Sequence, residues 1–270
     1  MITLLTDFGS ADGYAGAVKG VLVSICPGVQ IVELTHDVPP GDTAAGAFAL
    51  ANAVATFPPG TIHLAVVDPG VGTERRAVAV EAGGAVFVGP DNGLLWLAAR
   101  APRRVYELDR SEWFRSTVSP TFHGRDVFAP VAAHLASGVP IERLGTPAGD
   151  LSPLALPGVE RSAGSVTGTV VHVDRFGNLI TNIAQADLPA DPSEVRVEIA
   201  GRAIEGLAVS YGHVAAGEAL ALVGSAGTLE IAVNSGSAAA TFGVARGARV
   251  VVCTGRPDGR RSGTASKDTQ

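Results

Sequence analysis

The first half of the chain alternates short apolar runs with segments of helical spacing, and this alternation limits the possible folds more than any other feature. Segments that predict strands and helices follow one another in the order 2–6, 13–26, 29–35, 42–57 and 61–67, beginning with a strand. Such alternation is typical of strand–helix–strand units, whose parallel strands are buried on both faces. We therefore expect an α/β domain with a mainly parallel, Rossmann-like sheet over residues 1–155.

The pattern loosens in the remainder of this half. Residues 77–81 and 85–89 flank a pair of glycines and predict a β-hairpin, since glycines suit its tight turn. Residues 93–100 and 124–138 predict two more helices.

The second half of the chain contains short strand-like runs separated by turn residues, and no segment in it predicts a helix. The stretch 138–164 is rich in Pro and Gly and is the expected linker. We expect a smaller all-β, barrel-like domain over residues 156–255. The polar, Gly-rich residues 256–270 predict a disordered tail. The strand-like runs are 165–174, 177–183, 194–200, 202–210, 219–224, 228–234 and 248–253.

Composition argues against several classes of partner and location. The formal net charge of −6 disfavours nucleic acid, because phosphate backbones are bound by clustered Lys and Arg. The longest apolar stretch, 44–57, is shorter than the roughly 20 residues of a membrane-spanning helix. Cys26 and Cys253 lie in apolar runs, as reduced structural thiols do. With no signal-peptide pattern at the start, we expect a cytoplasmic protein that binds neither nucleic acid nor membrane.

Three successive predicted strands are each followed by a carboxylate. These are Asp7, Asp37 (which follows His36) and Asp68. Ligands of open α/β sheets bind at the carboxyl ends of the strands, so three acids there favour a site over separate helix caps or turns. The loop after the first strand lacks G-x-G-x-x-G, and the P-loop pattern G-x-x-x-x-G-K-[ST] is absent from the sequence. An acid after the first strand suits ribose hydroxyls, which indicates a nucleoside without an engaged phosphate.

Two further stretches contain groups that could carry chemistry. PTFHGRDVFAP holds His123 and Asp126, of which the second could equally be an acid at the start of a helix. VDRFGNLITNI holds Asp174 and Asn178, which could bind a cation and an adenine edge, or simply form a β-turn. Tyr211 could stack on a base and Ser225 could bind a carboxylate, although both positions also suit barrel corners.

Six stretches, in order, resemble the motifs of the S-adenosylmethionine (SAM) hydroxide adenosyltransferases, which are related to fluorinases and chlorinases. They are LLTDFGSADGYAGAVKGV, VVDPGVGTERR, GPDNGLL, PTFHGRDVFAP, VDRFGNLITNI and VNSGSAAATFG. The resemblance covers residues 2–253. It implies a homotrimer whose active sites lie between the α/β domain of one subunit and the β domain of its neighbour. There, water cleaves the substrate SAM at the ribose 5′ carbon into adenosine and L-methionine, and no cofactor or metal is implied.

The resemblance also implies individual roles. The catalytic residues are Asp68, Arg75 and His123. The substrate-binding residues are Asp7 for the ribose, Asp174 and Ser225 for the methionine part, Asn178 for the adenine edge and Tyr211 for the adenine face. In the halogenating relatives a Tyr matches Asp68 and a Ser matches Gly124, so this chain has the hydrolase pattern.

The chemistry needs no general acid, because the sulfonium of SAM leaves as a neutral thioether. Asp68 and Arg75 are expected to orient the attacking water, with His123 as their partner or as a proton route. Aspartate is a weak base, with a pKa of about 3.9 in water, so the identity of the base stays open.

Three other readings are also open. One is a halogenase, and another is a protein that binds SAM or adenosine without turnover. The third is a metal-dependent hydrolase, which has no H-E-x-x-H motif to support it. Its ligands would come from Asp7, Asp37, Asp68, His123 and Asp126.

Overall fold

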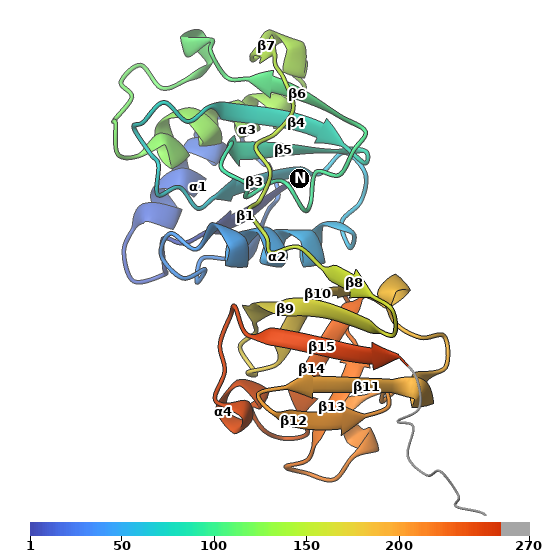
Figure 1. Cartoon of the computed structure of the whole chain (residues 1–270). Coiled ribbons are helices and arrows are strands. Elements are labelled where there is room, and N and C mark those ends of the chain that lie inside the picture. Colours follow the sequence, from blue (N-terminus) through green and yellow to red (C-terminus); the bar gives the residue numbers. More distant parts are fainter. Residues whose placement is uncertain (255–270) are drawn as a thin grey trace, which may run out of the picture. The chain divides into compact units, whose positions relative to one another are not determined.

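The chain divides into two compact units, Met1–Ala155 and Leu156–Gln270 (Figure 1). The computed structural model describes residues 1–254, and the predicted tail lies outside them. The boundary between the units falls within the predicted linker, which also contains two short strands.

The first unit holds a seven-stranded sheet in the order β2-β1-β3-β5-β4-β6-β7. The pairings from β2 to β5 are parallel, and those from β5 to β7 are antiparallel. The predicted α/β fold is therefore confirmed as a mixed sheet, and the predicted hairpin is formed by β4 and β5. The strands are β1 (Ile2–Thr6), β2 (Ile31–Thr35), β3 (Ile62–Val66), β4 (Ala77–Ala82), β5 (Ala85–Pro90), β6 (Arg103–Glu107) and β7 (Thr146–Pro147).

Helices cover both faces of this sheet because its central strands are apolar on both sides. Leu4 packs in a core with α1 (Tyr14–Ile25) and α3 (Ala129–Ala136), whereas its neighbour Leu5 packs in a second core with α2 (Thr43–Val54). Helices α1 and α3 also contact each other (Figure 1). This layering leaves the carboxyl ends of β1 and β3 free to present polar side chains.

The helix predicted over residues 93–100 is wrong. This segment forms turns, in which Ala99 N donates to Leu95 O at 2.9 Å but Trp96 N donates to Gly93 O at 3.2 Å. Gly93 has a φ of +95°, outside the helical region, and the apolar spacing reflects burial of Leu95 against the sheet rather than a helix.

The second unit holds an eight-stranded sheet in the order β12-β11-β15-β9-β10-β14-β13, with β8 paired to β9. Its end strands β12 and β13 lie next to each other, so the sheet is nearly closed into a barrel, as predicted. The interior is one apolar core that includes Val170, Ile183 and Ile231. The strands are β8 (Glu160–Ser162), β9 (Ser165–Val173), β10 (Leu179–Ala184), β11 (Val195–Ile199), β12 (Arg202–Glu205), β13 (Ala219–Val223), β14 (Thr228–Val233) and β15 (Arg249–Thr254).

The second unit also contains a short helix that the sequence pattern did not predict, α4 (Ala238–Phe242). Ser237 begins it by accepting a hydrogen bond from Ala240 N at 3.2 Å, and Gly243 ends it in the left-handed conformation. Five residues are too few for a recognisable helical period.

A π-helical turn, Gly124–Phe128, precedes α3. Short 3-10 helices lie at Ser111–Trp113, Ile141–Arg143, Gln185–Asp187, Pro192–Glu194 and Tyr211–His213. Within residues 1–254, no helix has the length and apolar character needed to cross a membrane.

Candidate active site

The loop that follows β3 brings Asp68 and Arg75 together by folding back on itself. Val71 N donates to Asp68 O at 3.2 Å, and Thr73 N donates to Gly70 O at 3.1 Å, which makes two successive turns. The Thr73 hydroxyl reinforces the second turn with a 2.7 Å bond to the same carbonyl. The side chains of Asp68 and Arg75, seven positions apart in the chain, are thereby brought into contact.

This loop also packs closely against the segment that leads to His123. Gly72 has a φ of +78°, and a Cβ added there would lie 2.5 Å from the carbonyl oxygen of Pro120. The position needs glycine for both reasons, since L side chains rarely adopt this φ and no room exists for one.

The guanidinium of Arg75 binds the Asp68 carboxylate in a bidentate arrangement. Nε donates to Oδ1 at 2.9 Å and to Oδ2 at 3.0 Å, and Nη2 donates to Oδ2 at 2.5 Å. The side chains are only 10% and 5% exposed. The guanidinium also lies 5.3 Å from the centre of the Phe128 ring. The carboxylate is thus held in one orientation by a charge-assisted pair.

Arg75 also fixes the state of His123. Its Nη2 lies 2.9 Å from His123 Nδ1, and because a guanidinium can only donate, Nδ1 is the acceptor and the neutral ring carries its proton on Nε2. Burial, and then the charge of Arg75, lower the pKa of His123 below its usual 6.5, although Asp68 and Asp126 act in the opposite direction. We refer to Asp68, Arg75 and His123 as the Asp68 cluster.

The Asp68 cluster adjoins a pocket of about 270 Å³ at the carboxyl ends of β1 and β3. Asp7, Asp68 and His123 all line it, and Arg75 contacts the last two. Asp7 is oriented by a 2.8 Å hydrogen bond from Gly41 N to its Oδ2. The structure therefore brings the four candidate residues of the first unit to one place.

Aromatic rings form part of this pocket, and sequence reasoning did not single them out. Phe8 and Phe122 line it and meet edge to face with ring centres 5.7 Å apart, and Tyr14 packs 5.4 Å from Phe122. A Cβ on Gly124 would lie 3.1 Å from the Phe8 ring. Their position in the sequence could have indicated them, because Phe8 directly follows Asp7 and Phe122 directly precedes His123.

A larger pocket, of about 440 Å³, lies at the other end of β3. Its walls are mostly apolar, including Phe57 and Phe87, and its buried polar residue is His63. None of the eight candidate residues lines it. We place the chemistry in the smaller pocket, because that pocket contains the charged groups.

The five ligands proposed for a metal-dependent hydrolase do not come together as a set: Asp7, Asp68 and His123 line one pocket, but Asp126 and Asp37 are not among its lining residues. Asp126 is fully buried and binds Arg125, Arg115 and Ser119 N, an arrangement that closes its own loop. Hydrogen bonds, first from Arg125, lower the pKa of Asp126 to about 2. Asp37 is exposed. Among residues 1–254, no three His, Cys, Asp or Glu side chains are placed to hold a metal ion.

In the second unit, Asp174 organises the turn between β9 and β10. Its Oδ1 accepts from Phe176 N and Asn178 N, both at 2.9 Å. Its Oδ2 accepts from Asn178 Nδ2 at 2.9 Å. These residues therefore do form a turn, as one of the two interpretations of the sequence expected. The same contacts fix the orientation of the buried Asn178 amide.

Glu230, in β14, joins these residues and was missed by sequence reasoning. Tyr211 donates its hydroxyl to Glu230 Oε1 at 2.8 Å, and the carboxyl is buried. Burial, and then the charge of Asp174, raise the pKa of Glu230. Burial and the bond to Glu230 raise the pKa of Tyr211 to about 12. A lone Glu in an apolar strand was the signal that could have found it. We call Asp174, Asn178, Tyr211 and Glu230 the Asp174 cluster.

Ser225 is less closely tied to this cluster. It lies exposed in the β13–β14 turn, directly after Gly224. A Cβ on Gly224 would lie 2.6 Å from Glu230 Oε2, so the backbone beside Ser225 passes close to the buried carboxyl.

Comparison with known proteins matches this arrangement to one family. A family model of the SAM hydroxide adenosyltransferase N-terminal domain matches residues 2–145, and that of the C-terminal domain matches residues 168–251. A protein of Salinispora tropica named (R)-S-adenosyl-L-methionine hydrolase is 45% identical, over 94% of this chain and 98% of its own. One of the same name from Thermus thermophilus is 44% identical, over 91% of this chain and 96% of its own.

More distant relatives and a solved structure agree with this match. Fluorinases are similar at 28% to 31% identity. The crystal structure of an uncharacterized conserved protein from Thermotoga maritima is 38% identical with a TM-score of 0.85, over 94% of this chain and 100% of its own. With both domain models matched in order, the chain belongs to the SAM hydroxide adenosyltransferase family.

Proposed function

We propose that this protein hydrolyses S-adenosyl-L-methionine to adenosine and L-methionine. The observation that carries the proposal is the nearly buried Asp68–Arg75 ion pair, joined by His123, beside a pocket that Asp7 also lines. The names of the relatives support SAM, in the form (R)-S-adenosyl-L-methionine, as the substrate.

In the proposed reaction, a water oxygen attacks the ribose 5′ carbon. The new carbon–oxygen bond forms as the carbon–sulfur bond breaks, and the electron pair of that bond goes to sulfur, which leaves as the neutral thioether of methionine. The attacking water loses one proton. The protein therefore has to hold water in line with the carbon and accept that proton, and good positioning alone can lower a barrier by roughly 7–11 kcal/mol.

Asp68 is the proposed acceptor for the water. Arg75 cannot accept a proton, and it keeps the carboxylate fixed. His123 uses Nδ1 to accept from Arg75 and holds its proton on Nε2, so in this state it is a donor rather than a base. The proposal thus assigns orientation and proton acceptance to Asp68, rigidity to Arg75 and a donated hydrogen bond to His123.

Substrate binding is divided by chemistry. Asp7 is proposed to accept from the ribose hydroxyls. In the second unit, Asp174 and Ser225 are proposed to bind the methionine part of SAM, Asn178 the adenine edge and Tyr211 the adenine face. These roles are supported by the family resemblance and, for Asn178, by the fixed amide.

The homotrimer and the cytoplasmic location stay predictions that rest on the family resemblance and on composition. The mass of the protein in solution, measured by light scattering after gel filtration, tests the first. A mass of one or two chains at micromolar concentration would contradict it.

Incubation with SAM in heavy-oxygen water tests the reaction. Attack at the 5′ carbon predicts labelled adenosine and unlabelled methionine. Separate (R) and (S) sulfonium epimers test the form of substrate. Binding of SAM without any product would favour a non-catalytic role, and halide-dependent formation of a 5′-halo-adenosine would favour a halogenase.

A further inference from the structure

The motif GPDNGLL contains two residues, Asp91 and Asn92, that the proposed chemistry does not use. They directly follow β5. Asn92 contacts Val67, just before the loop that carries Asp68 and Arg75, and Asp91 contacts Arg76, just after it. Each of the two residues holds one end of that loop.

Asn92 holds the end at which the loop begins. Its Nδ2 donates to Val67 O at 2.9 Å, and its Oδ1 accepts from Leu94 N at 3.2 Å, which fixes the orientation of the amide. Val67 is completely buried and directly precedes Asp68. The bond therefore sets the point from which the Asp68 side chain departs.

Asp91 holds the end at which the loop finishes. Its backbone N donates to Arg76 O at 3.0 Å, while its Oδ2 accepts from Arg76 Nε at 3.0 Å and Nη2 at 2.6 Å. The Asp91 side chain is only 2% exposed. Because Arg76 directly follows Arg75, these bonds set the position of the Arg75 backbone.

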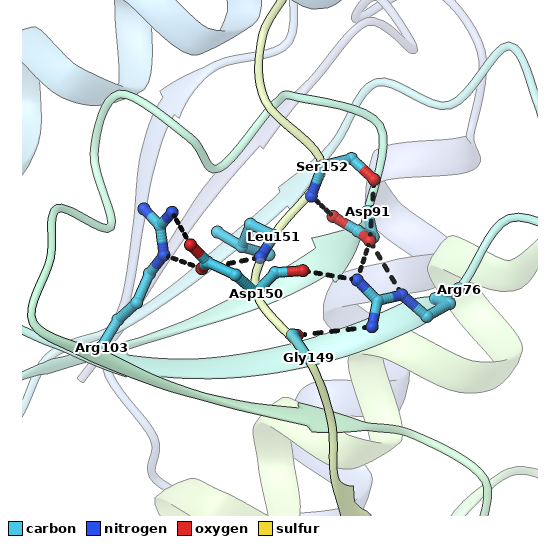
Figure 2. Close-up of polar contacts among 7 residues, drawn as sticks. All are labelled: Arg76, Asp91, Arg103, Gly149, Asp150, Leu151 and Ser152. Carbon is cyan, nitrogen blue, oxygen red and sulfur yellow. Dashed lines mark hydrogen bonds and ion pairs between the residues drawn. The ribbon is translucent and has the colours of Figure 1, made fainter.

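The same carboxylate is also tied to the segment near the end of the first unit, as Figure 2 shows. Ser152 donates its backbone N to Asp91 Oδ1 at 2.7 Å and its hydroxyl to Oδ2 at 3.0 Å. Arg76 Nη2 donates to Asp150 O at 2.8 Å. The buried Asp91 carboxylate thus accepts hydrogen bonds from both Arg76 and Ser152. These bonds leave Asp91 and Arg76 little freedom to move.

We propose that Asp91, Asn92 and Arg76 are positioning residues, which together hold Asp68 and Arg75 at the geometry needed for hydrolysis. We refer to them as the loop clamp. Between its two ends the loop is held by its own turns, by the close approach of Gly72 to Pro120 and by the contacts of Arg75, so the hold on its ends adds to these in setting where Asp68 and Arg75 lie. A displacement of about 1 Å at a reacting group can cost on the order of 100-fold in rate. The proposal rests on the proposed function, because it assigns the clamp to that reaction.

The test uses Asn92→Asp, which keeps the shape and the acceptor for Leu94 but loses the donor to Val67, together with Asn92→Ala and Arg76→Lys. We expect kcat for SAM to fall by about 10-fold to 100-fold with KM changed by less than about threefold, because the loop orients water and the proposed substrate-binding residues lie outside it. The matched control is Asp150→Asn. It breaks the ion pair with Arg103 in the same cluster but leaves both loop ends held, and its kcat should stay within about twofold of wild type.

A second measurement does not depend on turnover. Arg75 helps to lower the pKa of His123, so displacement of Arg75 should raise that pKa in the clamp variants, as followed by NMR of the imidazole ring. The Asp150→Asn control should show no such rise.

The outcomes separate the two proposals. If wild-type protein releases no adenosine, the proposed function fails, and the His123 titration still tests the clamp. If wild-type protein is active and all three variants keep kcat within about twofold, the clamp is overturned. An equal loss in the Asp150→Asn control, or a rise in KM with kcat unchanged, would also overturn it. Should Asn92→Ala fail to fold, Asn92→Asp and Arg76→Lys decide.

Discussion

Arg75 binds Asp68 through both Nε and Nη2, and the pair is almost enclosed by protein. A bidentate pair fixes the rotation of the carboxylate as well as its position. Lysine has a single charged group on a flexible chain and cannot reproduce this geometry. The pair therefore provides a rigid support for the water that the proposed reaction requires.

We expect Arg75→Lys to lower kcat by about 100-fold or more, because the charge stays but the carboxylate is no longer oriented. Arg75→Ala should also lower the free energy of unfolding by about 3–5 kcal/mol, since it leaves a buried carboxylate unpaired. Steady-state kinetics and urea unfolding measure the two effects. Arg100→Lys, at an exposed position beside the larger pocket, is the control and should change neither.

The companion variant Asp68→Asn keeps the shape of the side chain and removes its charge. We expect a similar loss of kcat, of about 100-fold, if the carboxylate accepts the proton of water. Near-normal turnover by Asp68→Asn, combined with an inactive Arg75→Ala, would show that the carboxylate has no essential part.

The pH dependence of kcat should report on His123. Its pKa is lowered, so the ring is neutral at pH 7, and protonation at acidic pH would abolish the bond accepted from Arg75. We expect kcat to be level at neutral pH and to fall only at acidic pH, below the usual imidazole pKa of 6.5. In His123→Gln the amide oxygen can accept from Arg75 without titrating, so the acidic limb should disappear. An unchanged limb in that variant would assign it to another group.

Local pattern predicted most of the fold because strands and helices of the first unit bury continuous apolar faces. The strand before Asp7 and the helix that Asp42 caps need only their own residues to be recognised. The helix prediction for residues 93–100 failed for the same reason. Leu95 is apolar because it packs in the core, and not because it lies on the buried face of a helix.

The candidate site was predictable where chain order and topology coincide, and not elsewhere. Asp7 and Asp68 follow adjacent parallel strands, so their proximity follows from the fold class. Asp126 lies three residues from His123, yet it turns to Arg115, a partner that only the folded loop supplies. Glu230 accepts a hydrogen bond from Tyr211, which lies 19 positions earlier in the chain, and no local spacing links the two.

Tyr211 offers a way to separate stacking from hydrogen bonding. Tyr211→Phe keeps the ring and loses the bond to Glu230, so we expect KM for SAM within about threefold and a loss of about 1 kcal/mol in unfolding free energy. Tyr211→Ala removes the ring, and KM should rise by about 10-fold or more, as base stacking is worth about 1–3 kcal/mol. Equal KM values for the two variants would contradict a stacking role.

Stability at acidic pH should depend on His63. The ring is fully buried, its Nδ1 lies 2.8 Å from Thr3 Oγ1, and burial lowers its pKa from 6.5 to about 4. Between these values the unfolded chain binds more protons than the folded one. Unfolding free energy should therefore decrease as the pH falls from about 6.5 towards 4, by at most about 3 kcal/mol. Urea unfolding of wild type and His63→Leu at several pH values measures this decrease. The same dependence of unfolding free energy on pH in both proteins would assign the decrease to another group.

Gly72 links the backbone of the loop to the position of Arg75, and alanine at this position tests that link. The added Cβ would lie 2.5 Å from Pro120 O, so the loop or the segment before His123 must move, and kcat should fall by about 10-fold or more. Gly28→Ala is the matched control, because Gly28 has a φ of +83° with no atom within 4 Å of an added Cβ. Both variants should lose about 1–2 kcal/mol of stability from backbone strain, but only Gly72→Ala should lose turnover. Full activity in a folded Gly72→Ala protein would mean that the close approach to Pro120 does not position Arg75.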